Sequence, residues 1–101
     1  GIQSEIRAPR LSEVIPAKDS LTVKWHTVPE ATGYIVYRKQ ENVAYKRVGI
    51  VVGTQTDNYE DKNVSPGETY TYTVRAFRVY NGITDRSSVF AAGVSSTVPK
   101  K

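Results

Sequence analysis

The sequence contains no cysteine and only one histidine, His26. The absence of cysteine excludes a disulfide framework and a thiol nucleophile, and it leaves the redox compartment open. His26 falls on the outward-facing side of its predicted strand, so we interpret it as a solvated surface residue and not as a general base. Neither a Gly-x-Ser-x-Gly turn nor a glycine-rich phosphate loop occurs. We therefore predict that the chain is not an enzyme and has no catalytic residue and no cofactor.

The sequence also lacks a long apolar run and a dense block of one charge. No segment approaches the roughly 18 apolar residues of a membrane-spanning helix, so no membrane insertion is expected. Residues 1–5 lack the charged-then-apolar build of a signal peptide. The 14 basic and 10 acidic residues give a formal net charge of +4, and the basic residues are scattered along the chain. A nucleic-acid-binding protein more often concentrates them in a stripe, so we expect no nucleic acid as a partner.

Alternation of apolar and polar residues is the dominant pattern that is present. Residues 21–26 (LTVKWH) alternate cleanly, as a half-buried strand requires. Turn signals at Pro66-Gly67 and Asn81-Gly82 separate further runs of the same kind. The predicted strands lie at 10–14, 21–26, 34–39, 45–52, 55–60 and 69–79, and within 89–98. Seven short strands without a helix indicate a β-sandwich or barrel, and 101 residues suffice for one domain.

Three features occur in an order and at a spacing that resemble the fibronectin type III family. They are Trp25 in the second strand, the run GYIVY at 33–37 in the third, and the run VSPGETYTYTVRA at 64–76. The resemblance covers residues 8–98 and implies an all-β, immunoglobulin-like β-sandwich of seven antiparallel strands. Residues 1–7 and 99–101 are then expected to be linkers.

The stretches 31–39 and 59–64 are similar to bacterial members of the family, which occur in secreted multidomain glycan-degrading enzymes and in surface proteins. The resemblance implies a non-catalytic structural or spacer module, extracellular or at the cell surface, that links or presents other domains. Its partners would be the neighbouring domains of its parent chain, and the isolated domain is expected to be a monomer. The alternative is a glycan- or protein-binding module that uses an exposed aromatic sheet face or the loops at 28–33 and 80–86.

A tyrosine that follows a Pro-Gly turn can pack its ring inward and return its hydroxyl to the nearby backbone. Tyr70 is predicted to do this, with Val64 beneath it. The rest of the core is predicted from the inward side of each strand. Its expected members are Trp25, Tyr34, Val36, Tyr59, Tyr72, Val74 and Ala76.

Oxygen-bearing side chains gather at Asp57, Glu60, Asp61 and Asn63. Their spacing is not that of an EF-hand loop, because the glycine and the bidentate acid of such a loop do not follow. We predict that Asp61 caps a turn ahead of Tyr70 and that the chain has no metal site.

The alternation that points Tyr34 and Val36 inward points a second set outward. This predicted interaction face consists of Ile35, Tyr37, Arg75 and Phe77. The third and sixth strands are neighbours in the family's fold, so these residues would share one sheet face, flanked by Lys39 and Arg47. Cross-strand pairing that stabilises the sheet is one interpretation. A docking face for a neighbouring domain or a glycan is the other, and both stay open at this point.

Overall fold

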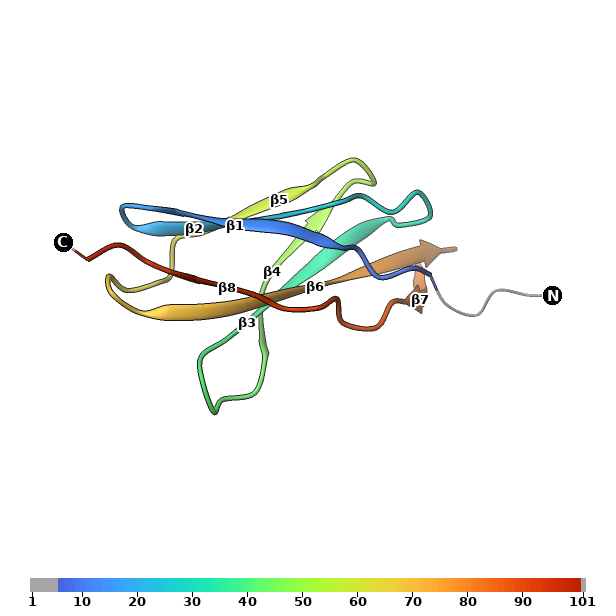
Figure 1. The fold of residues 1–101 in the computed structure, drawn as a ribbon. Helices are drawn as coiled ribbons and strands as arrows, with labels where there is room; N and C mark the ends of the chain where they lie inside the picture. Colours follow the sequence, from blue (N-terminus) through green and yellow to red (C-terminus); the bar gives the residue numbers. More distant parts are fainter. Residues whose placement is uncertain (1–5, 101) are drawn as a thin grey trace.

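Eight β-strands joined by loops make up residues 6–100, the part of the chain that the computed structural model describes (Figure 1). The strands are β1 (Leu11–Ala17), β2 (Ser20–Trp25), β3 (Gly33–Lys39), β4 (Lys46–Val52), β5 (Asn58–Asp61), β6 (Thr69–Tyr80), β7 (Ile83–Ser87) and β8 (Val94–Thr97). No helix occurs between residues 6 and 100. In that range, accordingly, no helix is long and apolar enough to span a membrane.

The strands form two sheets that pack face to face. One sheet has the order β1-β2-β5, and the other has the order β4-β3-β6-β7, with β8 also paired to β6. All of these pairs are antiparallel. Figure 1 shows the two sheets as stacked layers, with the long strand β6 running through most of the length of the second layer. The predicted all-β sandwich is therefore confirmed.

The expected seven strands become eight because the last strand is interrupted. Both β7 and β8 pair with β6, at Phe77↔Ser87 and at Tyr72↔Val94. Residues 88–93 lie between them and leave the regular ladder, which the prediction of one strand within 89–98 did not foresee. The Asn81-Gly82 turn between β6 and β7 has positive φ at both positions, 54° and 78°. This is the turn geometry that matches the twist of a two-stranded hairpin.

The core lies between the two sheets and consists of the inward-facing residues of each strand. Seven of the predicted core residues are buried there: Trp25, Tyr34, Val36, Tyr70, Tyr72, Val74 and Ala76. Tyr59 and Val64 are half-buried and pack against this core. The Trp25 indole donates from Nε1 to the carbonyl of Thr56 at 3.0 Å, so its polar atom is satisfied inside the sandwich.

The packed domain begins earlier than the predicted boundary at residue 8. Ile6 is buried and belongs to the hydrophobic core, although residues 1–7 were expected to be a linker. The prediction failed because a single apolar residue ahead of the first strand carries no alternation that could reveal its burial. At the other end Val98 is fully buried, whereas Pro99 and Lys100 are exposed. Residues 1–5 and 101 lie outside the described part of the chain.

Candidate functional site

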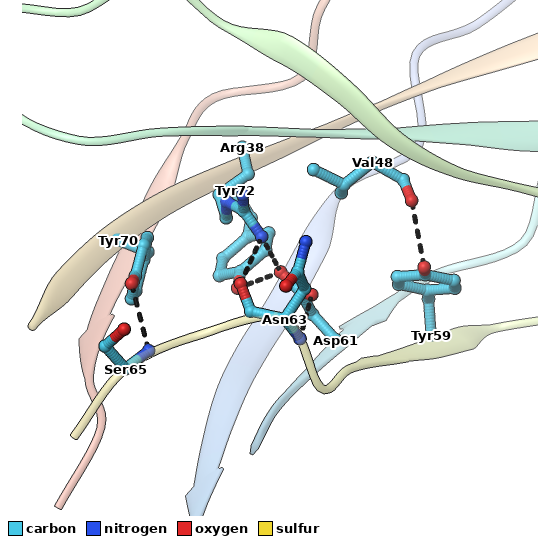
Figure 2. A network of polar contacts seen from close by, with 8 residues as sticks. All are labelled: Arg38, Val48, Tyr59, Asp61, Asn63, Ser65, Tyr70 and Tyr72. Carbon is cyan, nitrogen blue, oxygen red and sulfur yellow. Dashed lines mark hydrogen bonds and ion pairs between the residues drawn. The ribbon is translucent and has the colours of Figure 1, made fainter. Parts of the chain in front are cut away.

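Asp61 is the centre of a polar network between the two sheets (Figure 2). It ends β5 and is only 2% exposed. Its Oδ2 accepts hydrogen bonds from Arg38 Nη1 of β3 at 2.8 Å and from Tyr72 Oη of β6 at 2.7 Å. Its Oδ1 accepts from the backbone N–H of Asn63 at 3.0 Å, which is the turn cap expected from the sequence. One carboxylate therefore ties together strands from both sheets.

Burial and hydrogen bonding keep Tyr72 protonated, and hydrogen bonding keeps Arg38 charged. Burial raises the pKa of Tyr72 and the hydrogen bond to Asp61 raises it further, so the hydroxyl remains a donor. Burial works against the charge of Arg38, but the hydrogen bond and the charge of Asp61 outweigh it and leave the Arg38 pKa above its ordinary value. A general acid or base needs a pKa near the working pH. Tyr72 and Arg38 are therefore suited to holding the two sheets together through Asp61.

Tyr70 stands beside this network as the corner tyrosine. Its Oη accepts a hydrogen bond from the backbone N–H of Ser65 at 3.1 Å, five residues upstream (Figure 2). The Arg38 guanidinium lies over the Tyr70 ring at 5.3 Å from the centroid. The corner at 64–70 and the Asp61 network are thus joined through Arg38, and both stabilise the same end of the sandwich.

Tyr59 closes the gap between the two sheets next to Asp61. Its hydroxyl crosses from β5 and donates to the carbonyl of Val48 in β4 at 2.9 Å (Figure 2). The ring occupies the space above Gly49, where the Cβ of any other residue would collide with it. Gly49 is therefore required for close packing, because a side chain at that position would push the ring out.

A polar groove of about 590 Å³ opens on the outside of this network. It lies where β4 and β5 are the outermost strands of their sheets. Its lining residues are Arg38, Lys46, Arg47, Val48, Tyr59, Asp61, Lys62 and Asn63. Four of these side chains are cationic and one is a carboxylate, so the groove carries an excess of positive charge. Sequence reasoning missed it, because its cations come from three separate segments.

The predicted interaction face is only partly exposed. Ile35 lies opposite Arg75 in the ladder and Tyr37 lies opposite Thr73, so the structure brings the expected strands together with the expected sides outward. Phe77, however, is only 6% exposed, and the prediction that it faces solvent is wrong. Phe77 pairs with Gly33, and its ring lies against that residue, where a Cβ would be 2.9 Å from Cζ. The absent side chain leaves room for the ring to lie against the sheet.

Phe90 is the residue of this face that the sequence did not reveal. Its ring meets Tyr37 edge-to-face at 4.9 Å and lies 5.5 Å from the ring of Tyr45. The Arg75 guanidinium covers it at 5.4 Å, while Arg75 Nε donates to the carbonyl of Ser88 at 2.8 Å. We call Tyr37, Tyr45, Arg75 and Phe90 the outer cluster. The outer cluster holds residues 88–93 on the sheet where the last strand is interrupted. The sequence could not reveal the cluster, because its formation depends on where this segment lies in the fold.

Solved structures share this architecture. A Fn3-like protein from Clostridium thermocellum is 25% identical over 97% of this chain and 98% of that chain, with a TM-score of 0.74. The fibronectin type III domain of human fibronectin type III domain containing protein 3 has a TM-score of 0.74 at 17% identity, over 100% of this chain and 93% of that one. The chain has the fibronectin type III fold. No protein-family sequence model matches this domain, and no curated protein sequence matches it either.

The chain is also similar to part of a β-1,2-glucanase from Parabacteroides distasonis. The TM-score is 0.81 at 22% identity, and the match covers 97% of this chain. The chain spans 13% of the length of that glucanase. The likeness therefore concerns one portion of a much longer protein, and at this identity it shows the fold alone.

The acidic residues within 57–63 have separate hydrogen-bond partners. Asp57 accepts from the side chain of Asn58, Glu60 accepts from Ser20, and Asp61 serves the inter-sheet network. Among the side chains that the structure describes, no group of three or more His, Cys, Asp or Glu is arranged to hold a metal ion. His26 is exposed and directly follows β2, which ends at Trp25.

Proposed function

We propose that this fibronectin type III domain is a non-catalytic spacer that links or presents other domains of an extracellular bacterial protein acting on carbohydrate. The observation that carries the proposal is the placement of the two ends of the described chain at opposite poles of the sandwich (Figure 1). The similarity to one portion of a bacterial β-1,2-glucanase supports the carbohydrate-related setting.

Contacts at the two ends of β6 define this placement. The start of β6 lies beside the C-terminal segment, since the N–H of Gly67 donates to the carbonyl of Val98 at 2.8 Å. The end of β6 lies beside the loop before β3, since the N–H of Val79 donates to Thr32 Oγ1 at 2.9 Å. That loop follows Val28, which shares a surface hollow with Arg7 of the N-terminal segment. The attachment points are therefore separated by the length of β6, whose 12 residues span about 40 Å at 3.3 Å each.

The outer cluster and the inter-sheet network support a stiff spacer. Asp61, Arg38 and Tyr72 lock the two sheets to each other. Arg75 and Phe90 hold residues 88–93 on the sheet, so the aromatic side chains of this face already have partners within the domain. A rigid module of this kind holds its two neighbouring domains at a fixed separation, which a flexible coil does not do.

Two measurements test the proposal. Cysteines introduced by Arg7→Cys and Lys100→Cys, in a chain that has none of its own, allow spin labels to report the end-to-end distance. A single narrow distribution near 40 Å is expected, on the estimate of about 3.3 Å per strand residue. A broad distribution would contradict a stiff spacer. The second measurement incubates the purified chain with a panel of bacterial and plant polysaccharides. Release of reducing ends from any of them would contradict the proposal that the domain is non-catalytic.

A further inference from the structure

The groove beside the inter-sheet network gathers cations that are far apart in the sequence. Arg38 of β3 lies opposite Lys46 of β4 in the ladder, next to Arg47, and Lys62 follows β5 on the opposite sheet. Against these four positive side chains stands one carboxylate, Asp61, which leaves an excess of three positive charges. The sequence shows no dense basic block, so the fold creates this local charge. A concave surface lined by one sign of charge raises the local concentration of ions of the other sign.

Three of the four cations are available to a ligand. The charge of Arg38 is occupied by Asp61, to which it is bound at 2.8 Å. Among the residues that the structure describes, no carboxylate lies within ion-pair distance of Lys46 or Arg47, and both side chains are exposed. Lys62 lies 3.9 Å from Glu60 in a pair whose side chains are 78% and 50% exposed. Such an exposed pair contributes little and gives way at small cost.

The lining favours a hydrophilic anion over an apolar one. Val48 is the only aliphatic residue that lines the groove, and Asn63 adds an exposed amide to the lining. The Tyr59 ring is directed inward over Gly49, so the groove has no free aromatic face on which a nucleic-acid base could stack. It also has no apolar pocket of the kind that anchors a peptide side chain. A ligand with carboxylates and hydroxyls but no apolar side chains fits this surface best.

We propose that the groove formed by Lys46, Arg47, Lys62 and Asn63 binds an acidic glycan, through the carboxylates of successive uronate sugars. The preference for an anion rests on the charges of the groove alone. The choice of a glycan over other anions rests in addition on the carbohydrate-related function proposed above. Because the groove is open to solvent along the edges of β4 and β5, a polymer can pass through it without an end being captured.

Titration of the purified chain with trigalacturonate, followed by NMR chemical shifts at about 10 mM salt, where screening is weak, tests the proposal. The largest shifts are expected at residues 46–48 and 62–63. The double variant Lys46→Ala/Lys62→Ala removes two exposed side chains and should weaken binding about tenfold or more, since charge-assisted contacts are lost. The matched control Arg7→Ala/Arg10→Ala removes the same charge at the opposite pole and should bind as the parent does.

Titrations with control ligands distinguish a glycan from other anions. Maltotriose, a neutral trisaccharide, should produce no shifts, and triglutamate should bind at least tenfold more weakly than trigalacturonate. Equal binding of triglutamate or of inorganic phosphate would overturn the assignment of a glycan. Unchanged affinity in Lys46→Ala/Lys62→Ala, with the same fold by its spectrum, would overturn the site. The spin-label distance between the ends does not depend on this groove, so failure here is distinguishable from failure of the spacer function.

Discussion

Arg38 of β3 and Asp61 of β5 form an ion pair 2.8 Å long that joins the two sheets of the sandwich. The Asp61 side chain is 3% exposed and the Arg38 side chain is 17% exposed, so both charges have left most of their water. The free-energy cost of that desolvation is offset only while both partners are present. Removing one partner of the pair is therefore expected to lower the free energy of unfolding more than replacing both partners.

Asp61→Ala should lower the free energy of unfolding by about 3–5 kcal/mol, because Arg38 loses its counter-ion in a half-buried position. Tyr72 also loses the acceptor of its hydroxyl. The double variant Arg38→Met/Asp61→Leu should be markedly more stable than Asp61→Ala, since no buried charge remains. Urea unfolding of the three proteins measures this. A loss below about 1 kcal/mol in Asp61→Ala, the size expected of a surface pair, would contradict the assigned role.

Tyr70→Phe should destabilise the domain by about 1–3 kcal/mol, because the backbone N–H of Ser65 loses its acceptor while the ring stays in place. Tyr80→Phe is the matched control. That residue is 63% exposed, and its hydroxyl can be replaced at a cost within about 0.5 kcal/mol. Denaturant midpoints at neutral pH compare the two. Equal midpoints would show that the corner hydrogen bond contributes nothing.

Alkaline pH should destabilise the domain through Tyr72. Its pKa is raised above the ordinary value of 10.0 by burial and by the hydrogen bond to Asp61. Above pH 10.0 the unfolded chain therefore releases a proton that the folded domain retains, and stability that is fully present below that pH falls as the pH rises. One such proton contributes a slope of about 1.4 kcal/mol per pH unit.

Tyr72→Phe should reduce the alkaline slope without abolishing it. Burial also raises the pKa of Tyr34, against a smaller opposing effect of its hydrogen bond with Val28, so a second tyrosine acts in the same direction. The measurement is the urea midpoint of parent and variant between pH 9 and pH 11, a window chosen about one unit either side of the ordinary tyrosine value. Because the variant is less stable at every pH, the slopes are compared and not the midpoints. Parallel slopes would contradict a raised Tyr72 pKa.

Phe90→Ala should release residues 88–93 from the sheet. The edge-to-face contact with Tyr37 and the cover by Arg75 are lost, each worth about 0.5–1.5 kcal/mol. Hydrogen exchange should therefore speed up at the amides of Ser88 and Ala91, which bond to β6 at Ala76 and Val74. Val89→Ala is the control, since Val89 is 65% exposed and next to Phe90. Equal protection in both variants would show that the outer cluster does not hold the segment.

Local pattern was sufficient to predict much of the fold. Alternation located the core side of β2, β3 and β6, because successive side chains of a strand point to opposite faces. The Pro66-Gly67 turn located Tyr70, whose hydroxyl reaches only five residues back along the chain. Asn81-Gly82 located the β6–β7 hairpin, since the positive φ values of that turn favour these two residue types. In each case the deciding contact lies within a few residues of the pattern.

The exposure of a residue on a sheet face could not be predicted from the alternation along its strand. Parity placed Phe77 on the outer side of β6 correctly, but its ring lies against Gly33 on a neighbouring strand and is covered. The alternation along a strand assigns a residue to one face of the sheet, but it gives no information on which other residues cover that face. The same limit hid Phe90, whose position depends on where the interrupted last strand leaves the ladder.

The sequence by itself determined that this chain is one all-β sandwich with Trp25 inside and Tyr70 at its corner, because strand alternation and turn chemistry are short-range properties. Only the tertiary structure decided that Asp61 pairs with Arg38 across the sheets and that Lys46, Arg47 and Lys62 share one groove. These groups come from β3, from β4, from the end of β5 and from the residue that follows it, and no local pattern ties them together. Their meeting depends on the order of the strands in the two sheets, and charge acts through space and not along the chain.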